Sequence, residues 1–350
     1  MNDYVSMIIA AGATLTVTAL LGFVLIPWLH KLKFGQIILD IGPSWHKYKQ
    51  GTPTMGGIMF IVGTLLTVTV VFLVDFLRKG KLLTGGLGPQ ASTELIGKIV
   101  SGLLMATLFG LVGFLDDYTK VVKKRNKGLS IGQKTVMQLL ISAGYLISLY
   151  LSMGRNPSTL VPFLGEVHLG WFFWIFGACV LYTATNAVNF TDGLDGLCSS
   201  VTVTAGIALA VIAVLRGLFG VGVIAAAMVG GCVGFLCWNH YPAKVIMGDT
   251  GSMFLGGLLV AIAFALDCPL ILLLVGLIYV IEGLSDVIQI GYFKITGGKR
   301  VFKMAPIHHH FEMSGWKETK IVAVFSLVNC LGAAAGILVV LLGLKMNLNY

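Results

Sequence analysis

Apolar stretches of about 20 residues recur through the whole chain, and this recurrence restricts the fold more than any other feature of the sequence. A helix needs roughly 20 apolar residues to cross the hydrocarbon core of a bilayer, which is about 30 Å thick. A hydrophobic content of 57%, with only 11% charged residues, excludes a soluble globular protein. The stretches cover residues 5–29, 54–77, 94–115, 134–153, 169–188, 198–216, 219–239, 250–266, 270–292 and 319–344.

These stretches predict an all-α, polytopic integral membrane protein with about ten transmembrane helices, forming a single domain over residues 1–350. An even number of spans places both termini on the same side of the membrane. Lys and Arg are enriched in cytoplasmic loops, and seventeen of the 24 flank one side. That side is therefore predicted to be cytoplasmic, and both termini to be outside. The basic residues of the other side are Arg78, Lys79, Lys81, Lys98, Arg155, Arg216 and Lys345.

The net charge of +9 does not indicate nucleic-acid binding, because the basic residues adjoin the spans and have no aromatic residues interleaved with them. Membrane lipids and anionic substrates are the expected partners. Polar residues suited to catalysis fall almost entirely in the predicted cytoplasmic loops, so the domain is predicted to have one working face.

Two adjacent carboxylates, Asp116 and Asp117, stand at the cytoplasmic end of the third span. On a helix, neighbouring side chains point about 100° apart, so this pair can address two different atoms, such as a metal and a reacting hydroxyl. A solvated helix end would also explain two aspartates, so the pair alone is a weak signal.

The fifth span ends in the run NAVNFTDGLDG, from Asn186 to Gly196. Asn186, Asn189 and Asp192 are three residues apart and would share a helix face, while the two glycines allow a tight turn beside a ligand. A helix cap and turn would explain one or two of these side chains, but Asp195 makes four oxygen-bearing side chains in ten residues.

The eighth span opens with GDTGS, where Asp249 and Thr250 are predicted as N-caps. A carboxylate between glycines at a helix N-terminus also suits a bound phosphate with Mg²⁺. The cap and metal interpretations are compatible.

Three histidines, His308 to His310, precede the tenth span in a loop with Pro306 and several basic residues. Zinc is the obvious alternative, but consecutive histidines cannot all turn toward one ion, and no cysteine accompanies them. The sequence favours a rigid cationic loop that grips a phosphate.

Glu282 and Asp286 are carboxylates inside the apolar ninth stretch. A charge facing lipid at mid-membrane is costly, so both side chains should face a cavity or a partner. Before the second span, the turn residues of GTPTMGG follow Lys47 and Lys49, which could contact phosphate.

Cytoplasmic carboxylates, lysines and histidines, without a Ser or Cys nucleophile signature, favour Mg²⁺-dependent phosphoryl transfer. A transporter for an anionic solute is the alternative from another class, since ten spans and buried carboxylates permit one. The near-absence of polar residues on the outer side argues against transport.

At these residues the chain resembles the polyprenyl-phosphate N-acetylhexosamine-1-phosphate transferases, and within them the phospho-N-acetylmuramoyl-pentapeptide transferases. The motifs GPxxHxxK, GTPTMGG, DDYTK, NAVNFTDGLDG, GDTGS and APIHHHFE occur in the family's order and spacing. The HHHFE run is characteristic of the muramoyl-pentapeptide enzymes. Phe190 departs from the family, which commonly has Leu there.

The resemblance implies an activity in the bacterial cell membrane, with a cytoplasmic active site. UDP-MurNAc-pentapeptide and undecaprenyl phosphate would give lipid I and UMP, with Mg²⁺ as cofactor and a homodimer as the assembly. A sibling transferase that uses UDP-N-acetylglucosamine is the enzyme alternative. The family also implies a ninth span bent near Gly283 to Gly291. Direct attack by the lipid phosphate is favoured over a covalent aspartyl-phosphate intermediate, and both remain open.

The resemblance also assigns roles to residues. The metal-binding residues of the family are matched by Asp249 and Asp192. Its catalytic pair is matched by Asp116 and Asp117. The catalytic set is completed by Asp249, His308, His309 and His310. Lys49 matches the motif lysine better than Lys47. The residues implied in substrate binding are Lys49, Thr54, Lys120, Lys134, Asn186, Asn189, Asp192, Asp195 and Glu282.

Overall fold

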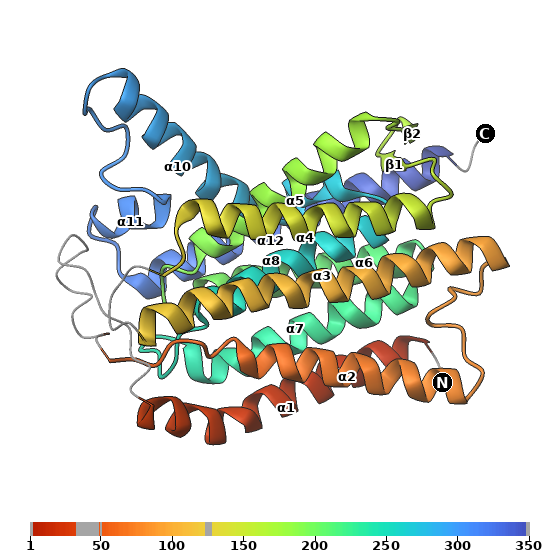
Figure 1. Ribbon diagram of the computed structural model, residues 1–350, viewed down its shortest axis with the longest axis horizontal. Helices are drawn as coiled ribbons and strands as arrows, with labels where there is room; N and C mark the ends of the chain where they lie inside the picture. The colour runs from red at the N-terminus through yellow and green to blue at the C-terminus, as the bar shows by residue number, and fades with distance from the viewer. Residues whose placement is uncertain (1–2, 33–48, 50, 123–127, 348–350) are drawn as a thin grey trace.

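The computed structural model describes residues 3–32, 49, 51–122 and 128–347 as a bundle of long helices (Figure 1). The helices and strands are α1 (Asp3–Lys31), α2 (Ile58–Leu77), α3 (Pro89–Val122), α4 (Ile131–Ser152), β1 (Ser158–Val161), β2 (Gly165–His168), α5 (Phe172–Thr191), α6 (Leu197–Leu215), α7 (Phe219–Asn239), α8 (Gly248–Ala265), the 3-10 turn η2 (Pro269–Ile271), α9 (Leu272–Val275), α10 (Leu277–Ile295), α11 (Ile307–Glu312) and α12 (Glu318–Asn347).

Nine helices in the described part of the chain are long and apolar enough to cross a membrane. The segments Pro269–Val275 and Leu277–Ile295 together form a further apolar pair, bent by 88°. The prediction of an all-α, polytopic membrane protein with about ten spans is therefore confirmed.

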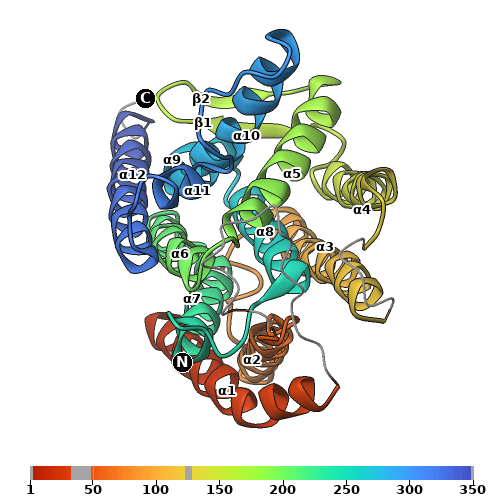
Figure 2. The ribbon, with the colours of Figure 1, turned by 90° about the vertical axis from the view of Figure 1, so that its left-hand side faces the viewer.

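Helix α8 lies at the centre of the bundle, with α3 and α5 packed against it (Figure 2). Its most apolar window is 94% buried. Small residues allow this packing: a Cβ on Gly256 would lie 2.7 Å from the Cα of Thr185 in α5, and one on Gly257 would lie 3.0 Å from the Cα of Ala106 in α3. Close backbone approach at small residues is a main source of helix association in lipid.

The start of α1 and the end of α12 lie at the same end of the bundle, together with the β1–β2 hairpin (Figure 1). The ends of α1 and α3 and the short helix α11 lie at the opposite end. The hairpin is antiparallel, with Ser158 opposite His168. No strand was predicted there, because four-residue strands are too short to show an alternating pattern.

The bend in the ninth stretch falls at Gly276, and the prediction of a bend near Gly283 to Gly291 was wrong. Helix α10 runs without interruption through both of those glycines. Gly283 packs closely on α5, where its Cβ would lie 3.4 Å from the Cβ of Ala187. Beyond the bend, α10 leaves the bundle (Figure 1) and exposes the large apolar side chains Leu284, Val287, Ile288 and Ile290.

Candidate active site

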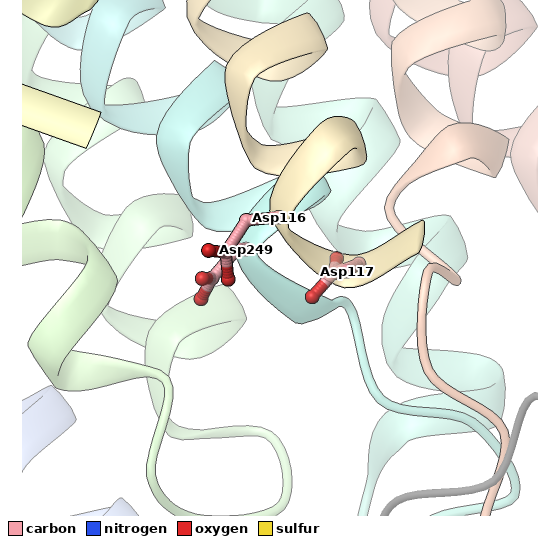
Figure 3. Close-up of side chains that lie close together, drawn as sticks. All are labelled: Asp116, Asp117 and Asp249. Carbon is pink, nitrogen blue, oxygen red and sulfur yellow. The ribbon is translucent and has the colours of Figure 1, made fainter. Parts of the chain in front are cut away.

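Three carboxylates meet where α3 ends and α8 begins, and Figure 3 shows their side chains together. Asp116 and Asp117 come from α3, and Asp249 comes from the first turn of α8. One oxygen from each lies within 4.8 Å of the others. In the described residues this is the cluster of His, Cys, Asp and Glu side chains that could hold a metal ion.

Gly113 explains how α3 comes so close to α8. A Cβ on Gly113 would lie 2.1 Å from the backbone oxygen of Asp249 and 2.6 Å from the nitrogen of Thr250. Because no larger residue fits, the backbones touch one turn before Asp116. Contact at this level brings the two carboxylates of α3 beside Asp249.

Gly248 fixes the other wall of the site. It has a φ of +72°, and a Cβ there would lie 2.5 Å from Oδ2 of Asp117 and 2.6 Å from Oγ1 of Thr54. Only glycine meets both conditions. The segment before α2 is held alongside, since the backbone nitrogen of Gly56 donates to the oxygen of Ile246 at 2.9 Å.

Asp117 caps α8 from the neighbouring helix. Its Oδ2 accepts from the backbone nitrogen of Thr250 at 2.9 Å and from the Thr250 hydroxyl at 2.7 Å. The predicted caps were wrong: the N-cap residue is Met247, with no side-chain cap bond, and Asp249 and Thr250 lie in the first turn. Asp249 is thereby free to face the other carboxylates.

Two lysines partly neutralise the carboxylates. Lys120 Nζ lies 2.6 Å from Oδ2 of Asp116 and 3.0 Å from Oδ2 of Asp249. Lys134 Nζ, from α4, lies 3.1 Å from the same Asp249 oxygen. Asn189 of α5 donates to the other Asp249 oxygen, Oδ1, at 2.8 Å. Three helices, α3, α4 and α5, therefore contribute side chains that contact Asp249 of α8.

Lys49 belongs to a second, buried cluster. Its Nζ lies 2.8 Å from Oδ1 of Asp195 and 2.6 Å from Oε1 of Glu318 at the start of α12. Burial by itself lowers the pKa of Lys49, but the Glu318 and Asp195 carboxylates outweigh this effect and raise it. Lys47 lies outside the described residues.

Asp192 and Asn186 do not belong to the three-carboxylate cluster. Asp192 is the half-buried C-cap of α5, and burial raises its pKa well above the ordinary value, as do the carboxylates of Asp249, Asp117 and Asp195. Asn186 donates to Oε1 of Gln138 at 3.1 Å. The shared helix face predicted from the spacing brings Asn189, but not Asn186, into contact with Asp249.

The three histidines lie on the short helix α11, and each bonds a different residue. His308 is buried, and its Nδ1 lies 3.0 Å from Oε2 of Glu282 on α10. Its Nε2 faces Gly193, where a Cβ would lie 2.1 Å away. His309 pairs with Glu312 at 2.7 Å, and His310 accepts from the backbone nitrogen of Lys303 at 3.1 Å.

Glu318, Gln138 and Ser252 were not predicted, although each bonds a predicted residue. Ser252 accepts from Asn189 at 2.8 Å, one turn into α8. Its position in GDTGS was the available signal. Glu318 and Gln138 resemble ordinary helix-start and helix-surface residues, so the sequence offered no signal for them.

Comparisons with known proteins agree with this geometry. A sequence model described as "Glycosyl transferase family 4" matches residues 99–267, and a "Phospho-N-acetylmuramoyl-pentapeptide-transferase" signature matches residues 49–61. The chain is 42% identical over 345 residues to the phospho-N-acetylmuramoyl-pentapeptide-transferase of Desulforudis audaxviator, with 95% of this chain and 98% of the relative covered. The chain belongs to the phospho-N-acetylmuramoyl-pentapeptide-transferase family. Two further enzymes of the same name are similar over most of their length. The one from Acetivibrio thermocellus is 46% identical, with 89% of this chain and 88% of the relative covered. The one from Listeria monocytogenes is 44% identical, with 96% of this chain and 98% of the relative covered.

The phospho-N-acetylmuramoyl-pentapeptide-transferase signature falls where the segment before α2 meets α8. It contains Lys49 and Thr54, and also Gly57, whose backbone nitrogen donates to the oxygen of Met247 at 3.0 Å. A Cβ on Gly57 would lie 2.3 Å from the Cα of Gly251. The signature therefore includes the residues that seat this segment against the carboxylate cluster.

Proposed function

We propose that this protein transfers phospho-MurNAc-pentapeptide from UDP-MurNAc-pentapeptide to undecaprenyl phosphate, producing lipid I and UMP. Family membership supports the reaction class. The observation that carries the proposal is the cluster of Asp116, Asp117 and Asp249 with Lys120 and Lys134 at one end of a membrane bundle. This arrangement suits two phosphorylated substrates, one soluble and one embedded in lipid.

Charge repulsion is the main obstacle that such a site must overcome. Two groups of charge about −2 at about 5 Å repel by roughly 3 kcal/mol in water and roughly 13 kcal/mol at an effective dielectric of 20. The ammonium groups of Lys120 and Lys134, both within 3.1 Å of Asp249, would turn toward incoming phosphates. Their attraction lowers the cost of bringing the substrates together.

The donor set fits Mg²⁺, which prefers carboxylate and phosphate oxygens. Asp249 would hold the ion, with Asp116 beside it and Asp192 at the edge of the site. When bound, Mg²⁺ neutralises charge on the diphosphate and stabilises the leaving nucleotide. Any carboxylate that binds the ion must first exchange its lysine contact.

We favour direct attack by the lipid phosphate on the β-phosphate of the donor. Asp117 or Asp116 would accept a proton if the lipid phosphate arrives protonated. Asp116 Oδ1 is held by the backbone nitrogen of Leu129 at 2.7 Å, while Oδ2 faces Lys120. Asp117 accepts two hydrogen bonds from Thr250 at one oxygen, which fixes its orientation. Trapping a phosphorylated protein from the UDP substrate alone would exclude direct attack.

Further proposals concern the remaining predicted residues and the setting. The substrate site would be lined or supported by Lys49, Thr54, Asn186, Asn189, Asp195, Glu282 and the three histidines. We propose that the carboxylate end faces the cytoplasm of a bacterial cell, that both termini are outside, and that the protein is a homodimer in the cell membrane. The excess of Lys and Arg on the cytoplasmic loops supports the orientation.

The decisive experiment measures UMP release by the purified protein with UDP-MurNAc-pentapeptide, undecaprenyl phosphate and Mg²⁺. We expect release that depends on lipid and metal and is lost in Asp249→Asn. Asp3→Asn is the matched control, because it removes a carboxylate at the opposite end of the bundle. UDP-N-acetylglucosamine replaces the donor in a parallel reaction. Release from that donor alone, or no release by folded protein, would contradict the proposal.

A further inference from the structure

The bend between α9 and α10 leaves two helix ends facing each other inside the bundle. Helix α9 ends at Val275, α10 begins at Leu277, and Gly276 between them makes no side-chain cap bond. Within a bilayer, no water is available to bond the free carbonyl and amide groups at such a break. Another part of the protein must satisfy them.

Asn329, in the middle of α12, bonds both helix ends. Its Oδ1 accepts from the backbone nitrogen of Ile278 at 3.0 Å, in the first turn of α10. Its Nδ2 donates to the oxygen of Val275 at 3.0 Å and to Oγ1 of Thr204 in α6 at 2.7 Å. The side chain is fully buried. A single amide therefore caps the end of α9 and the start of α10, and ties both to α6.

Helix α12 is shaped to bring this amide to the break. A Cβ on Gly332 would lie 2.6 Å from the backbone oxygen of Leu274, and one on Gly336 would lie 2.9 Å from Cγ1 of Val275. The backbone of α12 therefore lies directly against α9. This close fit holds Asn329 in one place relative to the bend.

The first turn of α10 leads to the candidate active site. Glu282 follows Ile278 by four residues, so it lies one turn further along α10. Its carboxylate holds Nδ1 of His308 at 3.0 Å, and Nε2 of His308 faces Gly193 beside Asp192. The direction in which α10 leaves the bend consequently determines where His308 meets the turn after α5.

We propose that Asn329 is a positioning residue: by capping both helix ends at the bend, it fixes the direction of α10 and, through Glu282, the place of His308 in the site. Nothing in the motifs points to Asn329, which lies far from the carboxylate cluster along the chain. The kinetic part of its test rests on the proposed transferase function, and the structural part does not.

The structural test measures the distance between spin labels on α4 and α10. The labels replace Leu140 and Ile295, which are 67% and 86% exposed, in a protein whose exposed cysteines are changed to alanine. The exposed cysteines are Cys179, Cys237 and Cys330. We expect one narrow distance distribution in the parent and a broader or shifted one in Asn329→Leu. Asn329→Asp keeps the acceptor for Ile278 and should lie between them.

The kinetic test compares UMP release by the same variants without labels. We expect kcat/KM to fall about tenfold in Asn329→Leu, equal to about 1.4 kcal/mol in the barrier, and less in Asn329→Asp. Cys330→Leu, the next residue and on the outer surface of α12, is the matched control and should match the parent.

Each outcome supports or overturns the proposal. An unchanged distance distribution in folded Asn329→Leu overturns it, and so does an altered distribution with parental kinetics, which would make Asn329 a merely structural residue. If Asn329→Leu does not fold, Asn329→Asp and Thr204→Val, which removes one partner of the amide, decide instead. If the parent itself releases no UMP, the transferase proposal fails while the distances still test the capping.

Discussion

Gly113→Ala offers a sharp test of how packing builds the carboxylate cluster. The new Cβ would lie 2.1 Å from the backbone oxygen of Asp249, and contacts of real Cβ atoms essentially never fall under 3.0 Å, so the two helices must separate by about 0.9 Å. This contact cannot yield cheaply, because the oxygen belongs to the backbone. The separation moves Asp116 and Asp117 away from Asp249 by a similar amount.

The expected effect on activity exceeds the effect on stability. A misplacement of about 1 Å can lower an enzymatic rate about 100-fold, whereas overpacking typically costs about 1–3 kcal/mol of stability. UMP release gives the rate, and the apparent melting temperature in detergent gives the stability. We expect Gly113→Ala to remain folded while kcat falls by about two orders of magnitude.

Two other glycines provide controls for this test. Gly144, in α4, has nothing within 4 Å of its added Cβ, so Gly144→Ala should leave both rate and stability intact. Gly110, one turn before Gly113, would meet the Cβ of Phe254 at 3.2 Å, so Gly110→Ala should have an intermediate effect. Equal activity in Gly113→Ala and Gly144→Ala would refute the reasoning that this contact sets the carboxylate geometry.

Two further predictions concern charge and metal. Glu318→Gln removes one of the two carboxylates that pair with Lys49, and we expect a loss of about 1.5–3 kcal/mol of stability, measured as a lower melting temperature. The exposed Glu166→Gln should leave the melting temperature unchanged. Equal melting temperatures for the two variants would show that this ion pair contributes nothing. Mg²⁺ at roughly 100 times its Kd should stabilise the protein by about 2.7 kcal/mol, and Asp249→Asn should abolish that shift. A shift that persists in Asp249→Asn would place the ion elsewhere.

The spans and the carboxylates could be predicted because each depends on local sequence. Apolar runs long enough to cross a bilayer gave α1, α2, α4 to α8 and α12 within four residues of the observed bounds, while α3 begins five residues earlier and ends seven residues later than predicted. The aspartates stand where those runs end, so their gathering at one end of the bundle follows from counting spans. The pairing of Asp116 with Lys120, four residues further along the same helix, is equally local, although it was not predicted.

The bend and the histidine arrangement depended on contacts between distant segments. Gly276, Gly283 and Gly291 look alike in sequence, but the break falls at Gly276, where Asn329 on another helix bonds both helix ends. The histidines bond partners that their spacing does not reveal: His308 bonds Glu282 of α10, His309 bonds Glu312, and His310 bonds the backbone of Lys303.

Glu318 could not be predicted as a site residue either, because its partners are distant in sequence. As an acidic residue in the first turn of a helix, it needs no explanation beyond the helix dipole. Its bonds to Lys49 and to the backbone nitrogen of Asp195 exist only because three loops meet. The spacing of residues along the chain does not predict these contacts.

The bond between Lys49 and Glu318 joins residues 269 positions apart, one before the second span and one at the start of the last. A chain that emerges from the ribosome in order inserts α2 to α10 before α12 exists. During that interval Lys49 and Asp195 lack their third partner, and the break at Gly276 lacks its cap. Assembly of the working protein in the membrane must therefore wait for the final helix, and a chain truncated before α12 would be inserted but inactive.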